Sequence, residues 1–182
     1  MSDPKTLETA LWWVQRWISG SMNDPAWSFE EAESMGIEAA FEVVQKEVGN
    51  ARSANEPVWR YLSVSERTAS RLEASLRLQP HEFPFQSFTT SARLAAEVGA
   101  ELARPGEVSL LVCALPTADD VMFGLPDLLA DPRSRPTMRA LEDWHNQEEV
   151  LVRVREPLTL QEVRRIDDWD AALAEEPQAL AT

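Results

Sequence analysis

The chain of 182 residues is long enough for one compact domain with a real core, or for one domain with a small appendage. Its 44% hydrophobic and 26% charged residues are typical of a globular protein and exclude a disordered one. No apolar run approaches the roughly 20 residues that span a bilayer, and the formal charge of −14 argues against direct nucleic-acid binding.

The single cysteine, Cys113, excludes an internal disulfide and fits a reducing compartment. The first residues lack the basic and apolar regions of a signal peptide. We therefore expect a cytoplasmic protein, either of the cell that makes it or of a recipient cell. The basic residues between 56 and 155 are all arginines, whereas the flanks are strongly acidic. This distribution favours binding of an anionic small molecule by residues 56–155, although an ordinary acidic protein would show the same distribution.

The first fifty residues have helical periodicity. Asp3 and Pro4 predict a helix start, and Gly20 predicts its end. The apolar positions of this helix are Leu7, Leu11, Val14 and Ile18. Ser28 and Glu31 form a capping-box pattern for a second helix, whose apolar positions are Ile37, Phe41, Val44 and Val48. Four tryptophans are expected to attach these helices to the rest of the chain rather than to form a ligand cage: Trp12, Trp13, Trp17 and Trp27.

After a polar connector at 50–56 the pattern becomes strand-rich. Strands are predicted over 57–63, 83–89, 108–115, 149–154 and 158–166. A helix capped by Ser65 should place Ala69, Leu72 and Leu76 inward, and another helix should span 91–103. Residues 116–139 are rich in proline and predict a long, partly ordered loop with a short helix at 125–130. The sequence therefore predicts an α+β protein in which two helices lead into a strand-rich body.

Three segments resemble, in order and spacing, the motifs of the Arg–Ser–Glu class of mono-ADP-ribosyltransferases. They are Val58–Leu62 (VWRYL), Phe85–Thr90 (FQSFTT) and Gln147–Leu151 (QEEVL). Each is weak alone, but each falls on a segment that periodicity independently assigns to a strand. The resemblance covers about residues 57–166. It implies a mixed β-sandwich-like transferase core at 51–169, an N-terminal helical segment (1–50) packed on that core, and a flexible acidic tail at 170–182.

The resemblance also implies roles for these residues and NAD⁺ as co-substrate. Glu149 is the expected catalytic carboxylate, because loss of nicotinamide develops positive charge on the ribose. Arg60 is the expected clamp for the pyrophosphate. Ser87 would hydrogen-bond and orient Glu149, with Thr89 supporting the same strand. Since side chains alternate along a strand, Glu149 should face the cleft with Gln147 while Glu148 points away; the competing interpretation is a solvated strand start.

Two departures from the family pattern are informative. Members that modify arginine generally carry Glu where this chain has Gln147, so an asparagine or glutamine acceptor is favoured over arginine. Tyr61 replaces a glycine often found after the motif arginine, and it either narrows the cofactor site or supplies a stacking ring. Trp144 and His145 correspond to the turn that recognises the protein target, although Trp144 is equally well explained as a half-buried anchor.

The remaining residues predict no other chemistry. Two histidines and one cysteine at unrelated positions make no metal site. No glycine-rich phosphate loop or nucleophile elbow occurs, so NAD⁺ would have to bind in the transferase cleft.

The sequence thus predicts an enzyme that transfers ADP-ribose from NAD⁺ to a protein target with a basic surface. An effector made by a phage or pathogen against host machinery would suit this activity. The alternative is an acidic binding protein that blocks a basic, nucleic-acid-binding partner by occupancy, without catalysis.

Overall fold

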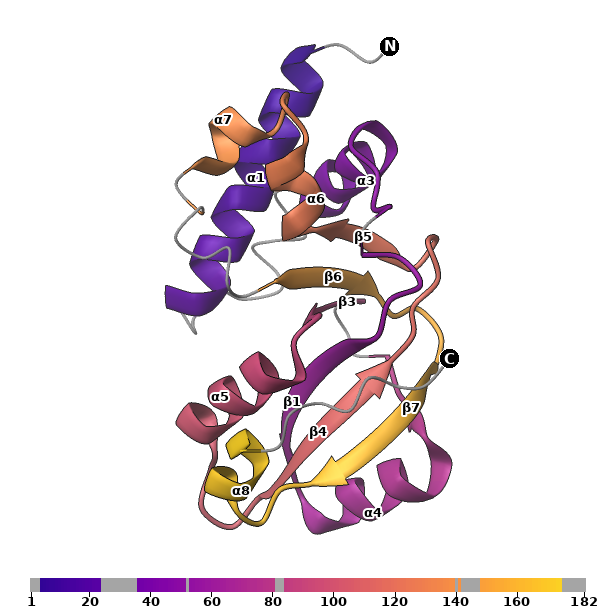
Figure 1. Cartoon of the computed structure of the whole chain (residues 1–182). Helices are drawn as coiled ribbons and strands as arrows, with labels where there is room; N and C mark the ends of the chain where they lie inside the picture. Colours follow the sequence, from indigo (N-terminus) through magenta and orange to yellow (C-terminus); the bar gives the residue numbers. More distant parts are fainter. Residues whose placement is uncertain are drawn as a thin grey trace.

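The computed structural model of the chain describes residues 4–23, 36–51, 53–80, 84–139, 141 and 148–174 (Figure 1). Among these residues, the helices are α1 (Pro4–Asn23), α3 (Ile37–Glu47), α4 (Glu66–Ser75), α5 (Ala92–Leu102), α6 (Leu125–Ala130), α7 (Arg135–Met138) and α8 (Trp169–Ala174). The strands are β1 (Val58–Val64), β2 (Arg77–Leu78), β3 (Phe85–Thr89), β4 (Val108–Ala114), β5 (Val121–Gly124), β6 (Glu149–Arg153) and β7 (Leu158–Arg165). The predicted α+β fold, with helices ahead of the first strand, is confirmed.

The seven strands of the described ranges form one sheet in the order β2-β7-β4-β1-β3-β6-β5, with antiparallel pairing throughout. β1 pairs with β4 along its whole length, but β1 and β3 share only the pair Trp59↔Thr89. In Figure 1, β5 and β6 run across the view, whereas β1, β4 and β7 run obliquely below them. The sheet therefore has two parts, β2-β7-β4-β1 and β3-β6-β5, joined at one residue pair.

The two parts of the sheet share one hydrophobic core. Val58 and Val112 from the first part pack in the same buried cluster as Phe88 and Val150 from the second. Leu72 of α4 also belongs to this cluster. The predicted N-terminal cap of α4 is present, since Ser65 Oγ accepts a hydrogen bond from the Thr68 backbone N–H. The two parts of the sheet therefore pack around a common buried cluster.

The N-terminal helices cover the second part of the sheet. Figure 1 shows α1 and α3 lying beyond β5 and β6. Every predicted apolar position from Leu7 to Ile18 in α1 is buried, in one cluster with Phe41 of α3 and with Phe123 and Leu151 of the strands. Amphipathic periodicity therefore identified the buried faces of both helices correctly.

The tryptophans of α1 have different environments. Trp17 meets the ring of Phe41 edge-on at a centroid distance of 5.7 Å, which attaches α1 to α3. Trp12, in contrast, is 47% exposed. Trp27 and the predicted capping pair Ser28 and Glu31 lie outside the described residues. Within the described ranges, no helix combines the length and apolar character needed to cross a membrane.

The prediction of a long loop at 116–139 is wrong. Val121–Gly124 forms strand β5, which pairs with β6, and two short helices follow it. The predicted short helix at 125–130 is confirmed as α6. Pro126 and Pro136 lie in the first turns of α6 and α7, where a missing N–H costs nothing, so these prolines mark helix starts rather than disorder. All four residues of β5 are buried, so the strand shows no alternation of apolar and polar residues in the sequence.

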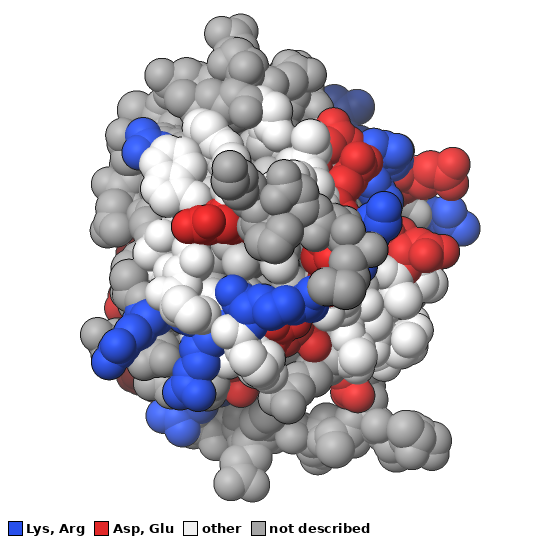
Figure 2. Space-filling view, turned by 90° about the horizontal axis from the view of Figure 1, so that it is seen from above, with Lys and Arg blue, Asp and Glu red and all other residues white. Residues whose placement is uncertain are grey.

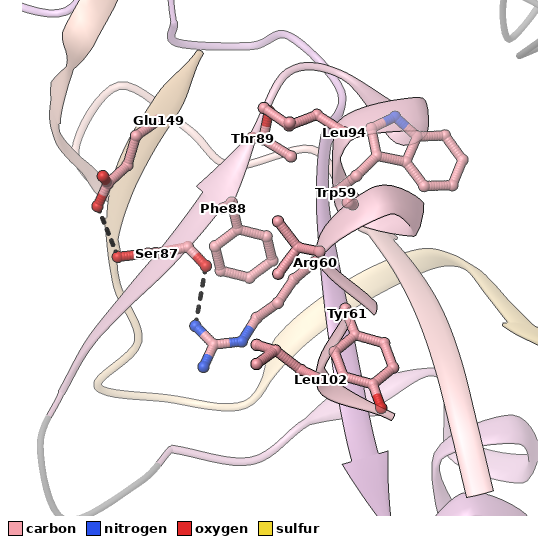
Figure 3. A pocket seen from close by; sticks show the side chains of 11 residues that line it. Trp59, Arg60, Tyr61, Ser87, Phe88, Thr89, Leu94, Leu102 and Glu149 are labelled. Carbon is pink, nitrogen blue, oxygen red and sulfur yellow. Dashed lines mark hydrogen bonds between the residues drawn. The ribbon is translucent and has the colours of Figure 1, made fainter. Parts of the chain in front are cut away.

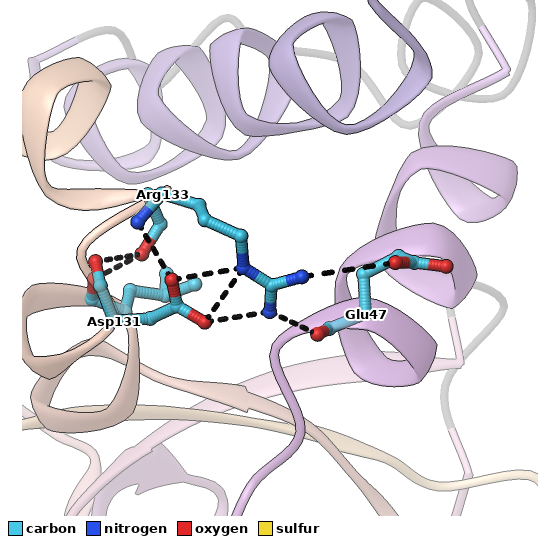
Figure 4. A network of polar contacts seen from close by, with 5 residues as sticks. Glu47, Asp131 and Arg133 are labelled. Atoms are coloured by element: carbon cyan, nitrogen blue, oxygen red, sulfur yellow. Dashed lines mark hydrogen bonds and ion pairs between the residues drawn. The ribbon is translucent and has the colours of Figure 1, made fainter. Parts of the chain in front are cut away.

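An arginine links this region to the N-terminal helices. Arg133 pairs with the Asp131 carboxylate at 2.7 Å and donates a hydrogen bond to the backbone carbonyl of Glu47, at the end of α3 (Figure 4). Gln45 and Asn50 add side-chain hydrogen bonds to the carbonyl of Val121. Because the Arg133 side chain is largely exposed, its ion pair contributes little stability, and the backbone contacts fix the position of α3 against β5.

The structure differs from the sequence predictions at the end of α4 and in the C-terminal segment. Leu76, predicted to point inward, ends α4 in the left-handed conformation and is exposed. The predicted flexible tail begins with α8, and residues 175–182 lie outside the described residues. α8 packs against α5 at Gly99, where a Cβ atom would lie 2.5 Å from Cη2 of Trp169 and 2.7 Å from Cδ2 of Tyr61.

This close packing makes Gly99→Ala a test of the contact between α5 and α8. An open helical glycine gains about 1 kcal/mol on replacement by alanine, but we expect a loss of about 1–3 kcal/mol here from overpacking. Urea unfolding measures the change, and the same substitution in a Trp169→Ala background should cost less. A more stable Gly99→Ala protein would show that the two helices do not pack as described.

Candidate active site

A pocket of about 350 Å³ lies where the two parts of the sheet meet. Its polar side chains come from three neighbouring strands, β1, β3 and β6, and its apolar wall comes from α5. The strands and α5 contribute Trp59, Arg60, Tyr61, Ser87, Phe88, Thr89, Leu94, Ala95, Val98, Leu102 and Glu149 (Figure 3). The pocket therefore contains five of the residues that the three sequence motifs pointed to: Arg60, Tyr61, Ser87, Thr89 and Glu149.

Glu149 enters the pocket as the first residue of β6. Its register partner on β3 is Thr89. Leu151, two residues further along β6 and so on the same face, pairs with Ser87. Alternation thus puts Glu149 on the same strand face as Ser87. Only 7% of Glu149 is exposed, so it is not a solvated residue at a strand start.

Ser87 connects the two charged residues of the pocket. Its hydroxyl donates a hydrogen bond to Oε1 of Glu149 at 2.8 Å. Its backbone carbonyl accepts a hydrogen bond from Nη1 of Arg60 at 2.9 Å. Figure 3 shows the two bonds leaving Ser87 in different directions, so that one residue fixes both the carboxylate and the guanidinium.

One nitrogen of the Arg60 guanidinium, Nε, is buried without a hydrogen-bond partner among the described residues. The guanidinium carbon lies 5.8 Å from the centre of the Phe88 ring, within range of a cation–π contact. Burial lowers the pKa of Arg60 to about 10, although the charge of Glu149 acts in the opposite direction. The side chain therefore stays cationic at neutral pH.

Burial dominates the electrostatics of Glu149. It raises the pKa of this carboxyl to about 7, while the Ser87 hydrogen bond and the Arg60 charge lower it. The two opposite charges thus compensate each other only in part. A carboxyl that titrates near neutral pH in a pocket is a common property of catalytic groups.

Glu148 is directed away from this constellation. Its carboxylate accepts a hydrogen bond from the Thr90 hydroxyl, and it does not line the pocket. The predicted choice of Glu149 over Glu148 as the residue facing the cleft therefore agrees with where the two side chains lie.

Thr89 and Tyr61 both line the pocket. Thr89 Oγ1 accepts the Ser91 backbone N–H at 3.1 Å, just before α5 begins. The Tyr61 ring meets Trp169 edge-on at 5.7 Å, and its hydroxyl lies 3.4 Å from Ser109 Oγ. Tyr61 is therefore held against α8, and it forms a fixed side of the pocket. Gln147, Trp144 and His145 lie outside the described residues.

The apolar wall of the pocket is a feature that the sequence interpretation missed. Leu94, Val98 and Leu102 recur at four-residue spacing on α5 and so share one helix face. Val98 and Leu102 are 38% and 59% exposed, which carries the wall out to the surface. The spacing was visible in the sequence, but only the packing of α5 against β1 and β3 shows that this face borders the pocket.

Among the described residues, no group of three or more His, Cys, Asp and Glu side chains is arranged to hold a metal ion. The pocket instead offers a cation, a carboxylate and a hydroxyl beside an apolar wall. These groups suit an organic ligand that carries both charged and apolar parts.

The role of Ser87 can be tested by titration. Its hydrogen bond stabilises the ionised form of Glu149, so Ser87→Ala should raise the pKa of Glu149 above its value of about 7 in the parent protein. Carboxyl ¹³C NMR measures this pKa directly, with Ser70→Ala on the outer surface of α4 as the matched control. An unchanged or lower value in Ser87→Ala would contradict the hydrogen bond.

No protein-family model, curated protein or solved structure matches this chain. The chemistry of the pocket residues is therefore the basis on which a function can be proposed.

Proposed function

We propose that this protein is a NAD⁺-dependent mono-ADP-ribosyltransferase that uses the pocket between β1, β3 and β6. The observation that carries the proposal is the Arg60–Ser87–Glu149 chain, in which Ser87 contacts both charged residues. These are the three residue types that the sequence motifs supplied from distant positions. An arginine, a hydroxyl and a buried carboxylate match the needs of a reaction on an anionic dinucleotide with a cationic reacting centre.

The proposed reaction begins with cleavage of the bond between ribose C1′ and the nicotinamide nitrogen. The bonding electron pair leaves with the nitrogen, so neutral nicotinamide departs and positive charge develops on the ribose. The ionised Glu149 carboxylate stabilises that charge, and the Ser87 hydroxyl holds the carboxylate in place. An acceptor side chain then attacks C1′, forms the new bond and releases one proton to solvent.

Arg60 would bind the pyrophosphate of NAD⁺. Its guanidinium remains charged, and the residue lines the pocket. A planar guanidinium can bind two phosphate oxygens at once. The apolar face of α5 would contact an uncharged ring of the dinucleotide.

The acceptor and the partner follow from the family resemblance. Gln147, in place of a glutamate, favours an asparagine or glutamine side chain as acceptor. Trp144 and His145 would contact the protein target, for which the net charge of −14 favours a basic surface. A cytoplasmic effector that modifies host machinery fits this combination.

Glu149→Gln tests the catalytic assignment. This variant keeps the shape of the side chain but removes the negative charge, so nicotinamide release and the labelling of lysate proteins from labelled NAD⁺ should fall by about 10²-fold or more. Glu156→Gln, on an exposed turn, is the matched control and should retain the activity. Labelling that persists in Glu149→Gln would show that this residue is not the catalytic carboxylate.

The alternative, an acidic protein that acts by occupancy, makes the opposite prediction. Figure 2 shows acidic and basic side chains interspersed on the face seen from above, without a continuous acidic field among the described residues. This arrangement argues against mimicry of a polyanion by that face. A biological effect that survives replacement of Arg60, Ser87 and Glu149 together would support occupancy and exclude catalysis.

The proposed mechanism also predicts a pH profile. Because the ionised form of Glu149 is the active one and its pKa is about 7, nicotinamide release should rise as the pH increases through 7. Below this value the rate should fall about tenfold for each pH unit. A profile of kcat for nicotinamide release between pH 5 and 9 measures it, and a flat profile would exclude Glu149 as the titrating group.

A further inference from the structure

The residue that precedes Glu149 has an unusual backbone. Glu148 has a φ of 46°, in the left-handed region that residues other than glycine rarely adopt. It is one of three such non-glycine residues in the described part of the chain, with Asn55 and Leu76. Leu76 ends a helix, where this conformation is common. Glu148 instead lies directly before a strand that carries a buried carboxylate.

Thr90 contacts Glu148 through both its backbone and its side chain. The Thr90 backbone N–H donates to the Glu148 carbonyl at 3.3 Å. The Thr90 hydroxyl donates to Oε2 of the Glu148 carboxylate. A residue in a sparsely populated conformation persists when its surroundings hold it there, and these two bonds hold the backbone carbonyl and the side chain of Glu148.

The conformation of Glu148 determines which way the next residue points. Thr89 and Glu149 are register partners, and Thr90 with Glu148 forms the adjoining contact just beyond the ladder. A change of one residue in the register of a strand turns every side chain to the opposite face. The contact between Thr90 and Glu148 therefore lies directly beside the last ladder pair, Thr89 with Glu149, and Glu149 is the residue that faces the pocket.

We propose that Thr90 is a positioning residue, which holds Glu148 in its left-handed conformation so that the Glu149 carboxylate stays in the pocket beside Ser87. Thr90 does not line the pocket, and it acts through Glu148. The geometric part of this proposal is independent of the reaction, whereas its effect on turnover rests on the proposed function.

Thr90→Val is the decisive variant, because it removes the hydroxyl while keeping the branched shape and the backbone N–H. Glu149 should then gain access to water, so its pKa, read by carboxyl ¹³C NMR, should fall from about 7 toward its ordinary value. The kcat of nicotinamide release should fall about tenfold or more, since a misplacement of about 1 Å can cost on the order of 10²-fold. The KM for NAD⁺ should change less, because Arg60 is untouched.

Conservative and control variants separate positioning from general destabilisation. Thr90→Ser keeps the hydroxyl and should restore both the pKa of Glu149 and the kcat. Glu148→Ala removes the same hydrogen bond from its other end, and combining it with Thr90→Val should add little further loss. Thr159→Val makes the same chemical change on the exposed surface of β7 and should leave both readouts unchanged.

The proposal is overturned if folded Thr90→Val protein keeps the parent pKa of Glu149, or if Thr90→Ser behaves like Thr90→Val. Should Thr90→Val fail to fold, Glu148→Ala tests the same bond by the same titration. If no variant, including the parent, releases nicotinamide from NAD⁺, the proposed function fails while the titration still decides the role of Thr90.

Discussion

One backbone pairing, between Trp59 and Thr89, joins the two parts of the sheet, and the geometry of the pocket depends on it. Arg60 follows Trp59 on β1, and Ser87 precedes Thr89 on β3 by two residues. Because β1 and β3 share no other pair, side chains from both faces of β1 reach the pocket, and the guanidinium has room to meet the Ser87 carbonyl. A full ladder between these strands would close this space. The incomplete pairing is therefore what creates the site.

The pocket holds two opposite charges that do not fully neutralise each other. Burial shifts the pKa values of Arg60 and Glu149 toward their uncharged forms, even though each charge favours the other. Ser87 forms a hydrogen bond with each of the two groups, in place of a direct ion pair between them. A direct buried ion pair would leave neither charge free for a ligand. A ligand with an anionic group for Arg60 and a developing cation for Glu149 would supply the missing compensation.

Sequence patterns predicted the parts of the molecule that local physics determines. Periodicity located the buried faces of α1 and α3, and the Ser65 cap located the start of α4. The family resemblance, rather than local physics, grouped Arg60, Ser87 and Glu149, which all line the pocket. Strand β5 was missed because all four of its residues are buried, so it shows no alternation of apolar and polar side chains. The left-handed Glu148 was missed because the sequence gives no sign of its contact with Thr90. The roles of Gln147, Trp144 and His145 stay predictions, since these residues lie outside the described ranges.

The strands that carry the site also carry the contact with the N-terminal helices. Phe85 and Leu151 lie on the same strand faces as Ser87 and Glu149, and they are buried in the cluster formed by α1 and α3. One continuous surface is thus apolar under the helices and polar in the pocket. Without these helices, the apolar part of that surface, at Phe85 and Leu151, would be exposed to water. Helices α1 and α3 therefore shield the strands that carry the pocket, so a shortened form of the protein should keep them as well as the strand-rich body.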